Sequence, residues 1–446
     1  MSVPDTPAHL SMEKVRHRAA GIDIGATEHW VCVDPGLASA PVRKFGTFTE
    51  DLITLVAWLK ELGITTVAME ATGVYWRELY TRIEEAGLEA RLVDPRKTRN
   101  PRGRKTDHQD CEWIWTMHAH GLLDGAFVPG PAVQELRTYL RFRQSRVLQA
   151  GVALKEVQRA MSLMNIKLQH VISDIGGTTG QRIIQAIVAG ERNPEVLAAL
   201  RDRRCKHDEA TLVKALRGTW RPEHLFLLRQ AHGDYEYHRR AIDACDEQVS
   251  AVIARIPAKG DDDTPLKPKP PSGKNDYGFD AQKAAHRLTG IDLTTIDGIG
   301  PNTALSLLGE IGFDLSPWPT VKAFTAWLGL CPNPKRSGGK HLGNLPTSAN
   351  LAARILRNAA MGLQGKQGEL ARFFAKIASR RGRAEAITAT AHKLARIVYA
   401  VFRDHVDFDP KKLAPAMTEQ RKKSLMERLA RQAGQLGMNL VPMTPA

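Results

Sequence analysis

Four acidic residues near the start of the chain have the types and spacing that metal-dependent phosphoryl chemistry requires. They are Asp23, Glu70, Asp107 and Asp110. Asp23 lies in an apolar β-branched run and Glu70 ends another, while the other two are three residues apart, on one face of a predicted helix. Clustered carboxylates repel one another unless divalent cations neutralise them, and Mg²⁺ prefers a few carboxylates that leave room for water and phosphate oxygens. Two such ions could activate a nucleophile and stabilise the leaving oxygen of a phosphodiester.

A serine loop much later in the chain offers a candidate nucleophile. Residues 326–345 read AWLGLCPNPKRSGGKHLGNL, in which Ser337 precedes two glycines and is surrounded by Lys335, Arg336 and Lys340. A serine that attacks phosphorus must be exposed and must have positive charge nearby to stabilise the transition state. The same loop is also typical of a turn that only holds a phosphate, so these residues alone leave both roles open.

A glycine hairpin precedes the serine loop. Residues 293–312 read LTTIDGIGPNTALSLLGEIG, with Gly298 and Gly300 around an apolar residue and Pro301 opening a helix. This pattern is typical of a helix-hairpin-helix, in which glycine N–H groups at a helix N-terminus hold a DNA phosphate. A capped helix without a ligand would have the same residues.

The elements that would position the acids alternate between strand and helix. Residues 20–34 read AGIDIGATEHWVCVD, two apolar runs around a short polar turn, which predicts two strands joined by a tight turn. The further predicted elements are a strand over 42–48, a helix over 51–63, a strand over 64–69, a helix over 75–86, a strand over 88–93 and a closing helix from Asp107 to about His120. This order predicts a mixed sheet covered by helices.

A basic loop lies directly before Asp107. Residues 91–106 read RLVDPRKTRNPRGRKT, with seven basic residues and a single acid. Such a loop would hold a nucleic-acid backbone close to the acidic cluster. The residues expected to bind nucleic acid there are Arg96, Lys97, Arg99, Arg102, Arg104 and Lys105.

The rest of the chain is predicted to be mostly helical. Apolar residues recur every three and four positions along two long segments within 131–257, which predicts an antiparallel coiled-coil arm with a small helical cap at 173–224. Two ordinary bundle helices would give the same pattern. The predicted domains are a mixed-sheet domain at 1–130, the arm at 131–257, a flexible linker rich in Pro, Gly and charge at 258–282, a helical domain at 283–404 and a basic polar tail at 405–446.

Composition bounds the class of protein. The chain has 446 residues, a net charge of +15 and 43% hydrophobic residues, which excludes wholesale disorder and indicates a polyanionic partner, most commonly nucleic acid. Five scattered cysteines with no C-x-x-C pair encode neither a disulfide framework nor a structural zinc site. No apolar stretch is long enough to cross a membrane or to serve as a signal peptide, so a cytoplasmic protein is expected.

The order of elements, with acids on the first strand, the fourth strand and the last helix, resembles the RNase H-like fold. The segments GIDIGATEHWVCV, AMEATGVYW and RKTDHQDCEW are more narrowly similar to the D-E-D-D pattern of one insertion-sequence transposase family. Its members are DEDD transposases that act as serine recombinases guided by a structured bridge RNA. Two departures from the family pattern are Cys111, where alanine often follows the last aspartate, and PTSANLAARILR, where a basic element usually follows the serine.

The resemblance implies a role for each motif. It assigns Asp23, Glu70, Asp107 and Asp110 to Mg²⁺ binding and Ser337 to nucleophilic attack. The implied function is a DNA transposase that cuts and rejoins strands at the element ends and target, with a guide RNA. Because the acids and the serine are far apart in sequence, a homo-oligomer, either a dimer or a tetramer, is expected.

Three other functions fit parts of the sequence. A RuvC-like metal-dependent junction resolvase or nuclease would use water as the nucleophile and Ser337 only to hold phosphate. The segment IDIGAT resembles the first phosphate loop of sugar kinases and actin-like ATPases, but a second phosphate loop and an adenosine pocket are not evident. An architectural DNA binder would use the glycine hairpin and the arm, yet it gives no reason for four acids to converge.

Overall fold

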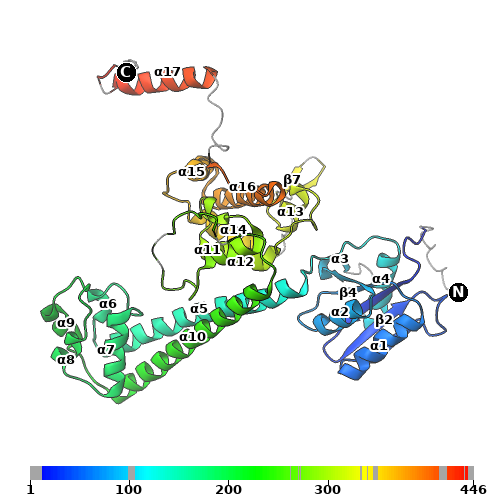
Figure 1. Ribbon diagram of the computed structural model, residues 1–446, viewed down its shortest axis with the longest axis horizontal. Helices are drawn as coiled ribbons and strands as arrows, with labels where there is room; N and C mark the ends of the chain where they lie inside the picture. Colours follow the sequence, from blue (N-terminus) through cyan, green and yellow to red (C-terminus); the bar gives the residue numbers. More distant parts are fainter. Residues whose placement is uncertain are drawn as a thin grey trace. The chain divides into compact units, whose positions relative to one another are not determined.

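The protein is described by a computed structural model that forms two compact units, Met1–Val128 and Pro129–Ala446 (Figure 1). The structure describes residues 13–98, 106–261, 263–269, 271, 273–331, 334–338, 340–344, 350–410, 419–435 and 437–439. Each unit is taken by itself below.

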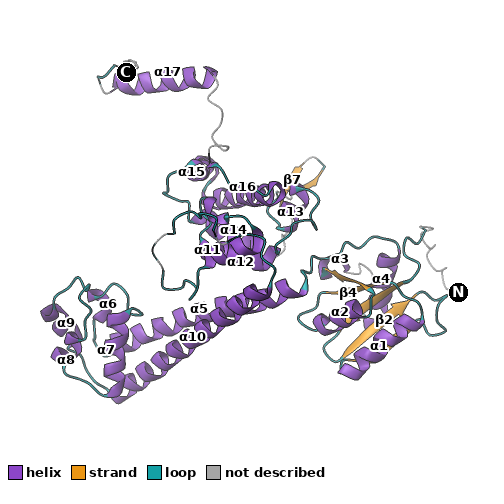
Figure 2. Cartoon of the chain, in the orientation of Figure 1, coloured by secondary structure: helices purple, strands orange, loops and turns teal. Residues whose placement is uncertain are grey.

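The first unit is built on a five-stranded mixed sheet, as predicted (Figure 2). Its strands are β1 (Ala19–Ile24), β2 (Glu28–Val33), β3 (Val42–Gly46), β4 (Thr66–Glu70) and β5 (Glu89–Val93). The spatial order is β3-β2-β1-β4-β5, in which β1, β2 and β3 pair antiparallel and β4 pairs parallel with both β1 and β5. Parallel neighbours require crossover connections, and here a helix precedes each added strand. This is the topology expected for an RNase H-like domain.

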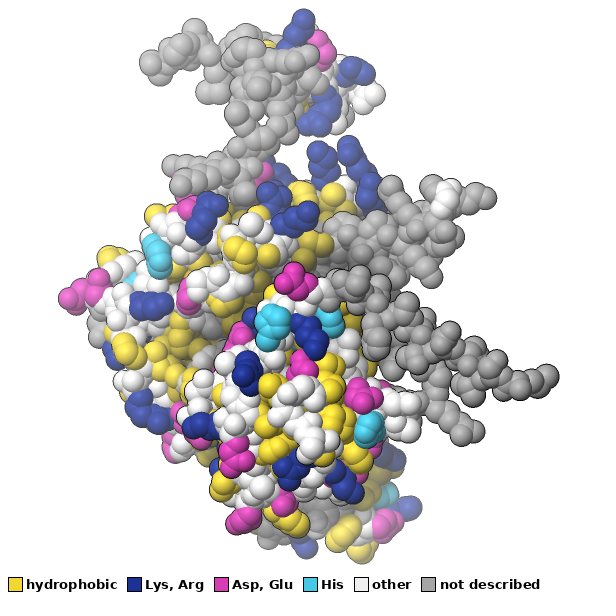
Figure 3. Space-filling view, turned by 90° about the vertical axis from the view of Figure 1, so that its right-hand side faces the viewer, with side chains coloured by type: hydrophobic (Ala, Val, Ile, Leu, Met, Phe, Trp, Pro, Cys, Tyr) yellow, Lys and Arg dark blue, Asp and Glu magenta, His cyan; other side chains and the backbone are white. Residues whose placement is uncertain are grey.

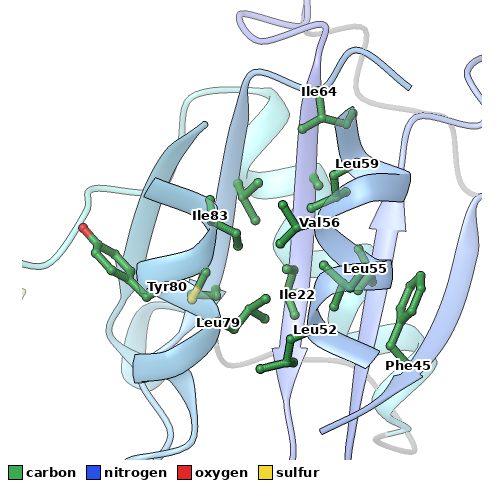
Figure 4. Close-up of a cluster of buried hydrophobic side chains, with 14 of the residues drawn as sticks. Ile22, Phe45, Leu52, Leu55, Val56, Leu59, Ile64, Leu79, Tyr80 and Ile83 are labelled. Atoms are coloured by element: carbon green, nitrogen blue, oxygen red, sulfur yellow. The ribbon is translucent and has the colours of Figure 1, made fainter. Parts of the chain in front are cut away.

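Helices cover both faces of this sheet. The helices of this unit are α1 (Thr49–Glu61), α2 (Trp76–Glu85), α3 (Pro95–Thr98) and α4 (Asp107–Ala119), of which α1, α2 and α4 pack on the sheet. Side chains alternate along each strand, so Ile22 and its neighbours two residues away pack under α1 and α2 in the larger core (Figure 4). On the opposite face, Ala68 and Val93 pack with Ile114 of α4. The short helix α3 interrupts the loop predicted at 91–106, because Pro95 favours the first turn of a helix.

His118 links α4 to the sheet. Its side chain is fully buried, and its Nε2 lies 3.0 Å from the Thr66 Oγ1. Burial disfavours the charged imidazolium and lowers the pKa of His118 to about 4 from its ordinary value of 6.5.

This histidine makes the first unit sensitive to acid. Since the folded-state pKa lies below the unfolded one, its contribution is fully present above pH 6.5 and is lost as the pH falls towards 4. The free energy of unfolding should drop by about 2 kcal/mol from pH 7 to pH 4.5 through this group. Urea unfolding, followed by hydrogen exchange of α4 peptides, measures the drop. The variant His118→Gln should show a smaller drop in the free energy of unfolding. The control His120→Gln, a half-buried residue at the end of the same helix, should show the same drop as the wild type. An equal drop in both variants would contradict the assignment to His118.

The second unit contains a long helical arm. Helices α5 (Pro131–Leu163) and α10 (Pro222–Arg255) run antiparallel, since Arg255 near the end of α10 pairs with Glu135 near the start of α5 at 2.6 Å. At the other end of the arm, α6 (Leu168–Val171), α7 (Thr178–Ala189), α8 (Pro194–Ala199) and α9 (Glu209–Leu216) share one apolar core with both long helices. The helical cap predicted at 173–224 corresponds to α7, α8 and α9.

A buried ion pair fixes the segment that follows the arm. Arg143 of α5 pairs with Asp246 of α10, and both side chains are buried. The Arg143 guanidinium also lies 3.8 Å from the Tyr277 ring and donates to the carbonyl oxygens of Asn275 and Asp276, at 3.2 and 2.9 Å. The described residues of the predicted flexible linker, 258–282, are therefore anchored to the arm in this region, because the guanidinium needs acceptors that one carboxylate does not supply.

The remainder of the second unit is mostly helical. Its elements are α11 (Ala281–Thr289), η1 (Leu293–Thr295), α12 (Pro301–Ile311), α13 (Val321–Trp327), β6 (Pro334–Ser337), β7 (Lys340–Asn344), α14 (Leu351–Met361), α15 (Glu369–Arg381), α16 (Arg383–Asp404) and α17 (Glu419–Gln435). The predicted serine loop is a two-stranded hairpin rather than an open loop. Gly338 at its turn has a φ of +55°, a conformation that glycine adopts without steric cost.

Two surface properties bear on function. Among the helices of the described residues, none is long and apolar enough to cross a membrane. Figure 3 shows Lys and Arg side chains spread over one face with Asp and Glu among them, so the positive charge on that face is not confined to one patch.

Candidate metal and nucleic-acid site

Three of the four predicted acids form one cluster. Asp23, Asp107 and Asp110 each offer a carboxylate oxygen, and these oxygens lie within 4.8 Å of one another. Asp110 is buried, Asp23 is half-buried and Asp107 is exposed, so the cluster reaches the surface on one side. An all-carboxylate donor set with one accessible side suits a hard cation such as Mg²⁺, which keeps water or phosphate oxygens among its ligands.

The strand alternation directs Asp23 towards α4. Ile22 and Ile24 belong to the core under α1 and α2, so the residue between them points to the other face of β1. Asp23 pairs in register with Trp30 of β2, whose ring makes an edge contact with the His108 ring at a centroid distance of 5.9 Å. The two strands and α4 thus converge around this carboxylate.

The start of α4 places the other two aspartates. Thr106 is the N-cap residue, and its hydroxyl accepts a hydrogen bond from the Gln109 N–H at 3.3 Å. Asp107 and Asp110 occupy the first turn, three residues apart, and therefore share a face. The prediction that these two residues lie on one face of the helix is confirmed, because both belong to the cluster with Asp23.

Gly21 allows α4 to approach the sheet closely enough to complete the cluster. A Cβ atom on this residue would lie 2.2 Å from the Trp115 nitrogen and 2.8 Å from the Cys111 carbonyl oxygen, both of which are backbone atoms. Gly21 was not among the predicted site residues. A glycine inside a predicted strand, two residues before a candidate acid, is the signal that could have identified it, since such glycines mark close backbone approaches.

Glu70 does not belong to the cluster of three. Its Oε2 accepts a hydrogen bond from the Thr98 hydroxyl of α3 at 2.9 Å. It does lie at the same edge of the sheet, because Ile22 and Met69 are register partners on parallel strands and Asp23 and Glu70 each come one residue later. Thr98 is a second residue that the sequence did not indicate, and its contact depends on the unpredicted helix α3.

A thiol adjoins the carboxylates. Cys111 is fully buried, and a hydrogen bond with Cys32 together with burial raises the pKa of its thiol. The negative charge of Asp23 acts in the same direction. Cys111 therefore stays protonated and serves as packing rather than as a metal ligand.

Ser337 lies in the second unit, whereas the acids lie in the first. It is the last residue of β6 and pairs in register with Lys340 across the turn at Gly338. The backbones of Lys335 and Arg336 belong to the same strand. The side-chain positions of these residues are outside the described part of the structure.

The glycine hairpin leads directly into α12. Gly298 has a φ of +92°, and Gly300 is the N-cap residue of α12, with Pro301 at the first helical position. A cavity of about 530 Å³ lies beside the hairpin and is also lined by Lys267 and Lys366. Residues of the hairpin and two lysines from other segments therefore line the same space.

The basic loop before Asp107 is only partly described. Arg96 and Lys97 lie on α3 by their backbone. The other four predicted nucleic-acid contacts, Arg99, Arg102, Arg104 and Lys105, lie outside the described residues.

Two family models match the chain. One, for DEDD transposases of the IS110 type and described as "Transposase", covers residues 20–165 and includes all four acids. The other, described as "Transposase IS116/IS110/IS902 family", covers residues 292–373 and includes the glycine hairpin and Ser337. No curated protein matches the chain. The two matches together show that the chain belongs to the IS110-type DEDD transposases, the DNA transposases of insertion sequences.

Proposed function

We propose that this transposase cuts and rejoins DNA strands through a covalent serine intermediate at a site that its acidic cluster completes. The observation that carries the proposal is the convergence of Asp23, Asp107 and Asp110 within 4.8 Å at the start of α4. Three carboxylates this close are costly without a cation. The cluster thus supports a metal-dependent reaction rather than simple DNA binding.

The acids would hold Mg²⁺. Asp23, Asp107 and Asp110 supply the ligands, and Glu70 at the same sheet edge would join them if Thr98 released its carboxylate. When bound, Mg²⁺ would neutralise charge on the scissile phosphate and on the leaving oxygen. The side chains would fix the position of the phosphate, with Asp110 buried and Asp107 open to the substrate.

Ser337 would be the nucleophile. The serine hydroxyl gives up its proton and its oxygen bonds to phosphorus, while the bond from phosphorus to the strand oxygen breaks and that oxygen takes up a proton. The phosphoserine keeps the phosphodiester bond energy, so attack by another strand's hydroxyl restores the serine and joins the strands. The position of Ser337 beside a tight hairpin turn supports this role, because such a turn lets a DNA backbone approach closely.

The proposal includes nucleic-acid partners and an assembly. The basic residues at 91–106, the hairpin with Gly298 and Gly300, and the serine strands with Lys335, Arg336 and Lys340 would bind DNA and a structured guide RNA. The guide RNA is carried over from the family resemblance. Because the acids and Ser337 belong to different units, a dimer or a tetramer could assemble the site between subunits. The protein would act in the cytoplasm.

A water-dependent nuclease is the alternative that the same cluster favours. Asp23, Asp107 and Asp110 could support attack by water without any serine. The two reactions differ in whether the protein becomes linked to DNA.

A trapping experiment decides between them. Wild-type protein, given Mg²⁺ and a DNA substrate that carries an element end, should form a protein–DNA adduct that survives denaturation. Ser337→Ala and Asp23→Asn should both lose the adduct, the first through the nucleophile and the second through the metal. The control is Ser162→Ala, an exposed serine of α5 that should leave the adduct unchanged. Strand cleavage by Ser337→Ala without an adduct would establish the nuclease instead.

A further inference from the structure

We infer that the exposed face of α15 is a binding surface for the phosphate backbone of duplex DNA. The surface is formed by Arg372, Lys376 and Arg380, called the α15 basic stripe below. The inference rests on the chain acting on DNA, but it does not depend on which group is the nucleophile.

The stripe lies opposite the face by which α15 packs. Successive residues of a helix are turned by about 100°, so steps of four keep the three basic side chains within one narrow sector. The buried residues of α15, Leu370, Ala371 and Phe374, occupy the other side of the helix. All three basic residues are exposed. The three basic side chains therefore have no role in packing α15 against the rest of the helical domain.

The charge of this region is strongly one-sided. Residues 370–400 contain seven Lys and Arg but a single acid, Glu385. Arg372 pairs with Glu369 at 2.5 Å, whereas no carboxylate pairs with Lys376 or Arg380 among the described residues. Like charges four residues apart destabilise a helix, and the favourable position at the helix C-terminus accounts only for Arg380. A polyanion on this face would remove the repulsion.

The stripe continues from the glycine hairpin. A Cβ on Gly368, directly before α15, would lie 2.9 Å from the Asp297 Oδ2, so the first turn of α15 is next to the hairpin. The cavity beside Gly298 is lined by Lys366, which leads into the same helix. Four residues of helix rise about 6 Å, so the stripe adds three cations over about 12 Å. Evenly spaced cations along a straight helix match the regular backbone of a duplex better than an irregular single strand.

The family match does not account for the stripe. The matched region ends at residue 373, so Lys376 and Arg380 lie beyond it. The basic residues singled out from the sequence were all elsewhere. The assignment therefore depends on the helix geometry and the charge alone.

Binding as a function of salt tests the inference. The protein is the full chain carrying Arg372→Gln, Lys376→Gln and Arg380→Gln, and the ligand is a 30-base-pair duplex in EDTA, so that no chemistry occurs. Each lost phosphate contact reduces the slope of log affinity against log salt by about 0.9, so the slope should become shallower by about 2 to 3. Affinity at low salt should fall by about tenfold or more.

A triple variant on the helical arm, called the arm variant, and a double variant of the stripe make the result decisive. The arm variant carries Arg159→Gln, Arg217→Gln and Arg229→Gln, at exposed positions on α5, after α9 and on α10. It loses the same charge as the stripe variant, but its slope of log affinity against log salt should change by less than one. Arg372→Lys with Arg380→Lys keeps the charge of the stripe and should keep the affinity. An unchanged slope in the stripe variant, or a loss of affinity equal to that of the arm variant, would overturn the inference. Because EDTA prevents cleavage, a failure of the serine mechanism would leave these results unchanged.

Discussion

Replacing Asp110 with asparagine should abolish Mg²⁺-dependent strand cleavage and, at the same time, make the metal-free protein more stable. Asp110 is the buried member of the cluster, and its carboxylate lies within 4.8 Å of those of Asp23 and Asp107. In the proposed site, losing this ligand should remove several kcal/mol of transition-state stabilisation, which corresponds to a rate lower by about three orders of magnitude. Removing one of three like charges should raise the free energy of unfolding without metal by about 1 kcal/mol or more.

The two effects are measured on the same samples. Unfolding is followed in EDTA and then in excess Mg²⁺, and cleavage of an end-containing duplex is assayed in parallel. The wild type should gain stability from Mg²⁺ and the variant should not, because binding to the folded state is what provides the gain. Asp124→Asn, in the same unit but outside the cluster, serves as the control. An Asp110→Asn protein that gains as much stability from Mg²⁺ as the wild type would show that this carboxylate is not a ligand.

The local pattern of the sequence was sufficient to predict the five strands and the longer helices of the first unit. The two apolar runs within 20–34 predicted β1 and β2, which pair antiparallel as expected for strands joined by a tight turn. The three-residue spacing of Asp107 and Asp110 predicted their common face. These predictions succeeded because period and spacing act within a single element.

Features that depend on contacts between elements were not predicted. The hydrogen bond from Thr98 to Glu70 requires α3, a four-residue helix inside an apparently irregular basic loop. The hairpin at Ser337 requires pairing between two short strands with little β-branched character. The contacts of Arg143 with residues 275 and 276 join segments more than a hundred positions apart. Neither period nor composition encodes such partners.

Gly21→Ala should have the second large effect, through the packing of α4 rather than through any lost ligand. The added Cβ would lie 2.2 Å from the Trp115 nitrogen and 2.8 Å from the Cys111 carbonyl oxygen. Backbone atoms in a helix cannot move individually, so α4 must shift away from β1. A displacement of about 1 Å is enough to lower the rate by about a hundredfold, and the lost packing should cost about 3 kcal/mol or more of stability.

Because the clash is with backbone atoms, this substitution has a specific signature. Trimming the neighbouring side chain with Trp115→Ala should not rescue Gly21→Ala, whereas rescue would be expected if side chains were in conflict. Gly125→Ala is the matched control, because its Cβ would lie no nearer than 4.0 Å to any described residue beyond its two chain neighbours; it should leave cleavage and stability nearly unchanged. The free energy of unfolding and its increase with Mg²⁺ are measured for the wild type, Gly21→Ala, Gly21→Ala combined with Trp115→Ala, and Gly125→Ala. Wild-type stabilisation by Mg²⁺ in Gly21→Ala would mean that Asp107 and Asp110 reach the metal without the close approach of α4, and that the position of the helix is not what assembles the site.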